Sequence, residues 1–158
     1  MCFYSNLDTV FNELNQNDFF LTPHCYESPK DYQKISELDI NATGLYNGGF
    51  YVLKNSENAK EILNWWSDKT IHKGYNDVAK GMFVDQIWLN YLPLYFNNIT
   101  ISKNKAINMA YWNLHERELS VNKGFQCNNT PLVMYHFSGF RLARPDLISI
   151  HQTRYSFV

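Results

Sequence analysis

Three glycine-containing stretches of this chain hold the residues that could do chemistry. In the first, 44–53, Asn47, Gly48 and Gly49 interrupt an apolar and aromatic run that otherwise predicts a buried strand. Glycine is costly inside a strand, because it loses the most backbone entropy and packs no side chain. The pair therefore indicates a bulge, or the close approach of a ligand or another segment. The alternative is a hairpin turn at Asn47-Gly48, since Asn-Gly is the strongest short hairpin signal.

An acid and a histidine mark the other two stretches, 81–86 and 136–140. Asp85 and Gln86 lie in the first turn of a predicted helix. The helix dipole alone favours an acid there, so Asp85 also has a purely structural interpretation. His136 ends a predicted buried strand and is followed by Ser138-Gly139, which places it to face a cleft. The alternative is a histidine whose hydrogen bonds serve only the fold.

The segments between these stretches predict the elements that position them. Hydrophobic periodicity and capping residues predict helices at about 8–15, 31–38, 57–71, 83–92 and 148–154. Short apolar runs predict strands at 18–21, 44–53, 99–102 and 131–137. Between the last two strands, 108–114 reads as a loop held by side-chain hydrogen bonds, because polar amides bracket its aromatic pair.

Two of the predicted helices have a defined apolar face. Ser56 is a good N-cap for the longest helix, and Trp65 falls off its apolar stripe, where it flanks the core or faces a cleft. The core stripe of that helix is Ala59, Ile62, Leu63 and Trp66. The helix at 83–92 should end at Pro93 and bury Val84, Ile87, Trp88 and Tyr91. In the helix at 8–15, one face should hold Val10, Phe11 and Leu14, with Asp8 as its cap.

Length and charge restrict the class of protein. With 158 residues, 45% hydrophobic and 18% charged, and with no repeat or linker, the sequence predicts a single globular domain, 1–158. The formal net charge is −1 and no Lys/Arg cluster exceeds a pair, which argues against nucleic acid as a partner. No apolar run reaches about 18 residues, so we expect no transmembrane segment and a cytoplasmic protein.

Aromatic residues and cysteines add two expectations. Phe, Tyr and Trp make up 16% of the chain, and their flat faces can pack a core or stack on sugars. The three cysteines are far apart in the sequence and match no metal spacing. They are therefore interpreted as reduced thiols.

Seven short motifs follow one another along nearly the whole chain. They are Thr22-Pro23-His24, Tyr46–Phe50, Trp65-Trp66, Asp85–Leu89, Asn108–Leu114, His136–Phe140 and Leu147–Gln152. In this order they resemble the C-terminal part of bacterial nucleotide-sugar glycosyltransferases of the GT-A type. The resemblance implies an α/β fold in which helices flank a mixed sheet.

The resemblance also implies a partner half. In such enzymes a Rossmann-like half precedes this region and ends in an Asp-x-Asp motif that holds a divalent cation, Mn²⁺ or Mg²⁺, against the donor diphosphate. This sequence contains no Asp-x-Asp, and Met1–Ser5 is similar to the residues that follow the motif. We therefore expect the acceptor-side half of the enzyme, with uncertain activity alone. A shortened sheet would expose an edge, which predicts a homo-oligomer that light scattering would detect.

By the same resemblance, particular residues take roles in sugar transfer. Asp85 would be the catalytic base or would orient the acceptor, and His136 would meet the diphosphate or its metal. Asn47 and the backbone of Gly48-Gly49 would lie against the donor sugar. The other substrate-binding candidates are Gln86, Trp112, Asn113, Ser138, Gly139 and, lining the same cleft, His24.

The expected activity is transfer of a sugar from a nucleotide-sugar donor to a glycan or cell-surface acceptor, as in polysaccharide biosynthesis. The alternative is a non-catalytic carbohydrate-binding or interaction remnant of such an enzyme. A third interpretation makes all these residues core. It predicts that His136→Ala costs stability and changes no ligand affinity.

Overall fold

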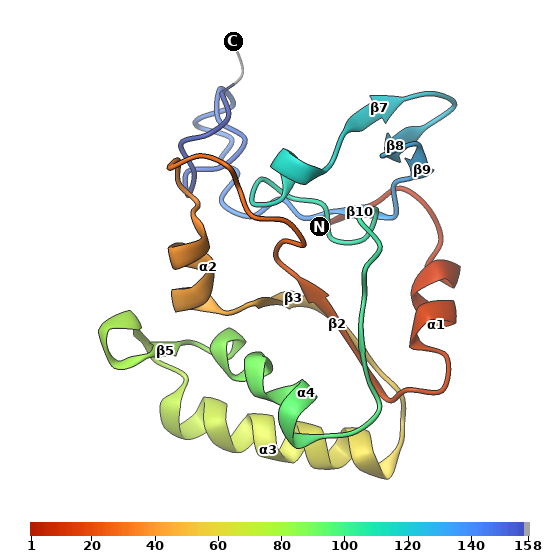
Figure 1. Cartoon of the computed structure of the whole chain (residues 1–158), viewed down its shortest axis with the longest axis vertical. Helices are drawn as coiled ribbons and strands as arrows, with labels where there is room; N and C mark the ends of the chain where they lie inside the picture. Colours follow the sequence, from red (N-terminus) through yellow and green to blue (C-terminus); the bar gives the residue numbers. More distant parts are fainter. Residues whose placement is uncertain (157–158) are drawn as a thin grey trace. The chain divides into compact units, whose positions relative to one another are not determined.

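Residues 1–156, which the computed structural model describes, form a mixed α/β protein with four α-helices and several small sheets (Figure 1). The chain divides into two compact units. Unit 1 comprises residues 1–9, 25–39 and 103 onward, and unit 2 comprises 10–24 and 40–102. Each unit has its own cluster of buried apolar side chains.

Unit 2 is built on a three-stranded sheet. Its central strand β2 (Phe19–Pro23) runs antiparallel to β3 (Tyr46–Leu53) and parallel to β6 (Ile99–Ile101). Phe19, Phe20 and Leu21 are fully buried, as expected for a central strand covered on both faces. The strands expected at 18–21, 44–53 and 99–102 are confirmed within two residues at each end.

The Asn-Gly-Gly motif forms a bulge inside β3. Leu21 pairs with Tyr51 and Pro23 pairs with Tyr46, so β3 uses more residues than β2 over the same distance. Residues 47–50 of β3 lie opposite the single residue Thr22 of β2, next to Pro23, which has no N–H to give to the ladder. The bulge interpretation is therefore confirmed, and the hairpin turn at Asn47-Gly48 is wrong.

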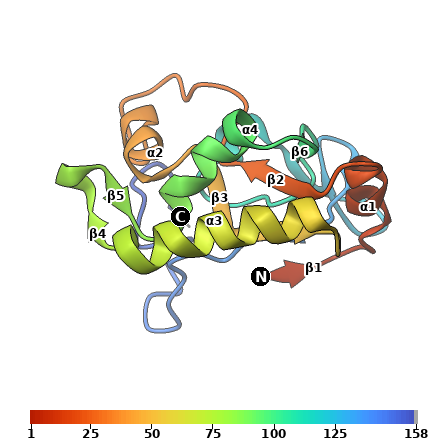
Figure 2. The same ribbon diagram turned by 90° about the horizontal axis from the view of Figure 1, so that it is seen from below.

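Helix α3 (Glu57–Lys73) packs along the sheet with α4 (Leu92–Tyr95) beside it (Figure 2). Ser56 caps α3 as predicted, its Oγ accepting the N–H of Ala59 at 3.1 Å. Leu63, predicted to be in the core stripe, is 42% exposed. The buried cluster of this unit contains Phe19, Leu21, Ile62, Trp66, Leu89 and Leu92.

The predicted helix at 83–92 is wrong. The chain instead forms a small hairpin, β4 (Asn76–Asp77) and β5 (Met82–Phe83) around η1 (Val78–Lys80), and then the 3₁₀-helix η2 (Gln86–Tyr91). A 3₁₀-helix has three residues per turn, so Gln86, Leu89 and Leu92 share one side. Leu89 and Leu92 are buried, whereas in the predicted face Val84 and Tyr91 are exposed and Trp88 packs, partly buried, against the same cluster. Pro93 lies in the first turn of α4 instead of ending a helix.

Two short helices differ from prediction in detail. α1 (Asp8–Leu14) buries Val10 and Leu14, but Phe11 is 55% exposed. α2 (Glu37–Thr43) replaces the helix predicted at 31–38. Its start is fixed by a reciprocal capping box: the Ser36 N–H donates to Asp39 Oδ2 at 2.8 Å, and the Asp39 N–H donates to Ser36 Oγ at 3.3 Å.

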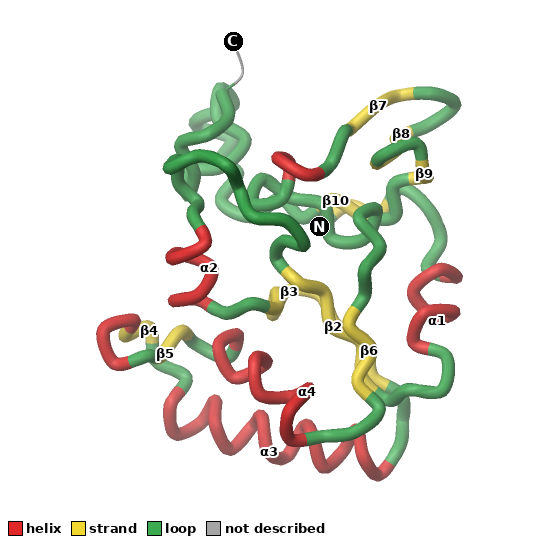
Figure 3. The backbone as a smooth tube through the Cα atoms, in the orientation of Figure 1, coloured by secondary structure: helices red, strands yellow, loops and turns green. Residues whose placement is uncertain are grey.

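Unit 1 consists chiefly of loops, seen in green in Figure 3. β1 (Cys2–Phe3) pairs antiparallel with β10 (Met134–Tyr135), and a separate three-stranded meander follows η3 (Leu114–Glu116). The meander contains β7 (Leu119–Val121), β8 (Phe125–Cys127) and β9 (Thr130–Pro131). The strand expected at 131–137 is thus divided between β9 and β10.

The helix predicted at 148–154 does not form. Gln152 Nε2 donates to the Tyr155 carbonyl at 2.6 Å, and the Tyr155 N–H donates to Gln152 Oε1 at 2.7 Å. These side-chain bonds satisfy backbone groups that a helix would otherwise use, so the segment turns instead. Arg154 also reaches the carboxylate of Asp31 with two bonds of 2.8 Å.

A buried ion pair holds the loops of unit 1 where strands are missing. Glu116 Oε2 accepts the N–H groups of Tyr26 at 2.9 Å and Glu27 at 2.6 Å, while Arg117 donates to the carbonyls of Lys105 at 2.7 Å and Ile107 at 2.8 Å. The three cysteines are free thiols, as predicted. In the described part of the chain, no helix has the length and apolar character needed to cross a membrane.

Candidate functional site

Gln86 lies directly against the glycines of β3. Its Oε1 accepts the Gly48 N–H at 2.9 Å, and its Nε2 donates to the Thr43 carbonyl at 3.0 Å. A Cβ added to Gly48, or to Gly44 at φ +123°, would lie 3.3 Å from the Gln86 side chain. The segment that approaches this backbone is therefore the start of η2, and the glycines make room for Gln86.

His24 and Asn47 complete this cluster. Asn47 Nδ2 lies 3.3 Å from His24 Nε2 and 3.5 Å from Gln86 Oε1, and Asn47 Oδ1 accepts the Gly49 N–H at 3.1 Å. His24 is 6% exposed and Asn47 5%. Asn47 thus holds the cluster together from within, and the exposed Gly49 is the part of the motif that a ligand can reach.

Asp85 immediately precedes η2 and is half-buried. Its carbonyl accepts the indole N–H of Trp66 at 2.8 Å, which fixes its backbone to α3. Its side chain makes no capping bond to the helix. Asp85 is therefore no hydrogen-bonding N-cap, and any structural role of this acid at the start of η2 is electrostatic alone.

A second cluster lies in unit 1, around His136. His136 Nδ1 donates to Asn108 Oδ1 at 3.1 Å. Asn113 Nδ2 donates to the Asn108 carbonyl at 3.1 Å, and Asn113 Oδ1 accepts the Ala110 N–H at 2.9 Å. Asn108 and Asn113 are both fully buried. The loop 108–114 is therefore held by side-chain hydrogen bonds, as predicted.

Trp112 supports the imidazole of His136 from inside the unit. The two rings lie 5.1 Å apart at 78°, and Trp112 is only 3% exposed. Tyr111 packs edge-on against Trp112 at 5.1 Å. With its ring buried, Trp112 offers no stacking face of its own and packs against His136 instead.

Burial lowers the pKa of His136. The imidazole is therefore neutral near pH 7. Because Nδ1 carries the proton given to Asn108, Nε2 holds the lone pair. His136 can accept a hydrogen bond or serve as one metal ligand. Among residues 1–156, no three His, Cys, Asp or Glu side chains are grouped so that they could hold a metal ion.

Gly139 meets a requirement that only glycine satisfies. It has φ +70°, and a Cβ there would lie 2.4 Å from His151 Cδ2 and 2.6 Å from Ser149 Oγ. The Ser138 N–H donates to the His136 carbonyl at 3.0 Å, which closes the turn. Ser149 and His151 were not among the predicted site residues. Their motif, 147–152, was the only sequence signal for them.

The predicted site residues thus gather in two clusters, one in each unit. The unit 2 cluster holds His24, Asn47, Gly48, Gly49 and Gln86, with Asp85 next in sequence. The unit 1 cluster holds Trp112, Asn113, His136, Ser138 and Gly139, to which the structure adds Asn108.

Comparison with known proteins gives two curated relatives in Bacillus subtilis (strain 168). The uncharacterized protein YfnF is 31% identical over 154 residues, which are 96% of this chain and 51% of the relative. The uncharacterized protein YfnD is 29% identical over 143 residues, 89% of this chain and 44% of the relative. No family model and no solved structure matches. The chain therefore spans about half the length of the curated relatives it matches.

Proposed function

We propose that this chain is the acceptor-side half of a GT-A type nucleotide-sugar glycosyltransferase, which moves a sugar from a nucleotide-sugar donor to a glycan or cell-surface acceptor. Three findings support the proposal. Seven motifs that resemble those of the family follow in order along the chain. The fold is mixed α/β. The curated relatives are about twice as long as the matched region, as expected for one half of a larger enzyme.

The arrangement of His136 carries the proposal. A leaving nucleoside diphosphate is multiply charged and needs fixed partners. An imidazole oriented by a buried amide, neutral and with Nε2 free of that bond, suits direct contact with a protonated phosphate oxygen or with a cation bound to the diphosphate. A cation would need further ligands beyond His136, which the proposal places in the nucleotide-binding half.

In the proposed reaction, Asp85 takes the proton from the acceptor hydroxyl. The acceptor oxygen forms a bond to the anomeric carbon as the bond from that carbon to the diphosphate oxygen breaks. The electron pair of the broken bond leaves with the nucleoside diphosphate. Gln86 and Asn47 hold the bulged backbone at Gly48-Gly49 against the donor sugar.

The test is a transfer assay on the complete reading frame that contains these residues, with Mn²⁺ and a panel of nucleotide sugars. Release of nucleoside diphosphate is the readout. Asp85→Asn should lower kcat by about 10²- to 10⁴-fold with little change in KM, as expected for a lost general base. Asp68→Asn, an exposed acid on α3, is the matched control and should leave the rate unchanged. Absence of turnover with every donor, or full activity of Asp85→Asn, would contradict the proposal.

A row of aromatic rings favours a second candidate, a non-catalytic carbohydrate-binding module. Trp88 stacks on Tyr91 at 6.2 Å, and Tyr91 lies 5.4 Å from Tyr95. Tyr91 and Tyr95 are 38% and 58% exposed, so their faces are open to sugar C–H groups. Titration of the 158-residue chain with oligosaccharides separates the two. Binding that is lost in Tyr95→Ala, with no turnover by the complete frame, would favour the module.

A further inference from the structure

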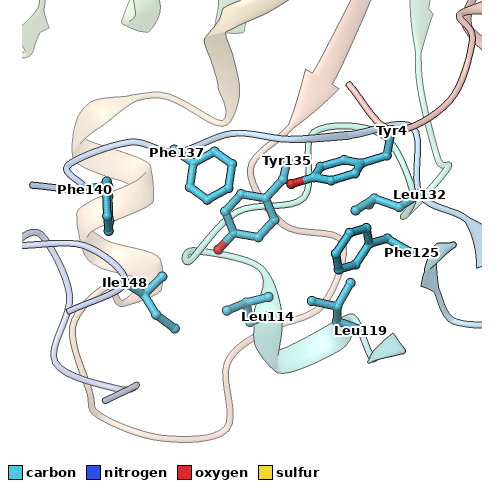
Figure 4. Close-up of a pocket in the computed structure, with 9 residues that line it drawn as sticks. All are labelled: Tyr4, Leu114, Leu119, Phe125, Leu132, Tyr135, Phe137, Phe140 and Ile148. Carbon is cyan, nitrogen blue, oxygen red and sulfur yellow. The ribbon is translucent and has the colours of Figure 1, made fainter. Parts of the chain in front are cut away.

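A pocket of about 300 Å³ lies in unit 1, and it shares no residue with either cluster (Figure 4). Its size is at the lower end of the range for small-molecule sites in proteins. The lining residues come from the residue after β1, from η3 and the meander, and from β10 and the loops that follow it. They are Tyr4, Leu114, Leu119, Phe125, Leu132, Tyr135, Phe137, Phe140 and Ile148.

The walls of this pocket are fixed by contacts between distant segments. The Tyr4 N–H donates to the Val133 carbonyl at 2.9 Å, continuing the pairing of β1 with β10. The rings of Tyr4 and Phe125 meet edge-on at 4.9 Å, and those of Tyr135 and Phe137 lie 4.5 Å apart. A ligand would therefore enter a site whose rings are already positioned, which lowers the ordering cost of binding.

The pocket leaves large apolar side chains in contact with water. Phe125 is 44% exposed, Phe137 47% and Phe140 41%. Removing apolar surface from water is favourable by about 25 cal/mol per Å². Concave apolar surface with several half-exposed aromatic rings is the usual character of a small-molecule site, whereas single exposed apolar side chains carry no such meaning.

The polarity of the lining selects the ligand. The nine side chains include no acid, base or amide, and the two phenol hydroxyls are their only polar groups. We propose that this pocket binds an uncharged, mainly apolar ligand, an alkyl chain or aromatic ring with one hydrogen-bond-accepting oxygen. A nucleoside diphosphate is excluded, because no cationic side chain would compensate its charge. The proposal is independent of the glycosyltransferase proposal.

Tyr135 is the group that would meet the ligand oxygen. Figure 4 shows its ring at the centre of the pocket, with the hydroxyl directed toward Leu114 and Ile148. Burial and the neighbouring Tyr4 raise the pKa of Tyr135 to about 12, so the hydroxyl remains a donor at any physiological pH. A carboxylate at that place would be desolvated without a countercharge, so the pocket should reject it.

The test compares octan-1-ol with octanoate, which have the same chain length but differ in charge. Titration of the 158-residue chain, followed by ¹⁵N–¹H chemical shifts, should show saturable binding of octan-1-ol, with octanoate at least about tenfold weaker. Leu119→Trp, at a half-exposed position of the wall, should fill the pocket and weaken octan-1-ol about tenfold or more. Tyr135→Phe should weaken octan-1-ol and leave toluene binding unchanged.

Leu142→Trp is the matched control, because Leu142 is 88% exposed and does not line the pocket. It should bind octan-1-ol as the wild type does, and circular dichroism should show that all variants fold. Equal affinity for octan-1-ol and octanoate, or no effect of Leu119→Trp, would overturn the proposal. So would a dimer by light scattering whose formation Leu119→Trp prevents, since a second copy would then occupy the pocket.

Discussion

Each unit of this protein has a histidine that is hydrogen-bonded to an asparagine side chain, and the bond runs in opposite directions in the two units. In unit 2, Asn47 Nδ2 donates to His24 Nε2. In unit 1, His136 Nδ1 donates to Asn108 Oδ1. The first bond uses the Nε2 lone pair inside the protein, whereas the second leaves the Nε2 lone pair of His136 for another partner.

The two histidines also differ in burial. His24 is 6% exposed, whereas His136 is half-buried at the end of β10. The comparison teaches that the same two residue types can lock a bulged strand in one place and present an oriented acceptor in another. The direction of one hydrogen bond separates a pair that uses the Nε2 lone pair from a pair that leaves it open.

The largest effect should come from the amide that supports the His136 pair. Asn113→Ala removes two hydrogen bonds from a fully buried side chain and leaves the Ala110 N–H unpaired. We expect a loss of about 3 kcal/mol in the free energy of unfolding, measured by urea denaturation. Asn122→Ala, at an exposed position of the meander, should change it by less than about 0.5 kcal/mol. A similar small change for Asn113→Ala would mean that the loop does not depend on this amide.

A double-mutant cycle tests the structural role of the unit 2 pair. Asn47→Leu and His24→Leu should each cost about 2 kcal/mol, because each removes a hydrogen bond between two buried side chains. The double variant should cost less than the sum, with a coupling energy of about 1 kcal/mol or more. Strict additivity in urea denaturation would contradict a direct bond between the two side chains.

Local signals in the sequence predicted the elements of unit 2 better than those of unit 1. The Ser56 cap, the buried β2 run and the bulge at Gly48-Gly49 depend on neighbours in the chain. In unit 1, the helix predicted at 148–154 fails because the Gln152 side chain takes over backbone groups at Tyr155. Competition between a side chain and the helix for the same backbone groups does not change the hydrophobic periodicity from which the helix was predicted.

In the candidate site, too, contacts between residues that are distant in the sequence could not be predicted from local patterns. Asn47, Gly48 and Gln86 were predicted as site residues, but that Gln86 itself fills the space beside Gly48 follows only from the 3₁₀ geometry of η2. Asn108 belongs to one of the seven motifs but was not a predicted site residue, because the sequence gives no sign that an asparagine 28 residues from His136 contacts it. Sequence patterns indicated which residues could do chemistry. The role of each residue in the structure depends on long-range hydrogen bonds, which those patterns do not contain.

The smallest predicted effect is a pH dependence that belongs to the His136 pair. The pKa of His136 in the folded protein is lowered from 6.5, so between the two pKa values the unfolded chain binds more protons. The free energy of unfolding should therefore fall as the pH falls below about 6.5, and His136→Gln should reduce that slope. Urea denaturation at intervals from pH 7.5 to pH 5 measures it.

Carboxylates whose ionised form is stabilised in the folded state change the free energy of unfolding at lower pH. Their contribution is therefore separate from that of His136. Arg154 lowers the pKa of Asp31 to about 2, and hydrogen bonds from Ser56, Asn98 and Asn58 lower that of Asp18, both from 3.8. Their stabilisation is complete above 3.8 and is lost only below it. A wild-type slope between pH 7.5 and pH 5 that His136→Gln leaves intact would show that His136 takes up its proton as readily in the folded protein as in the unfolded chain. Burial would then not keep the imidazole neutral, and the contrast with His24 would fail.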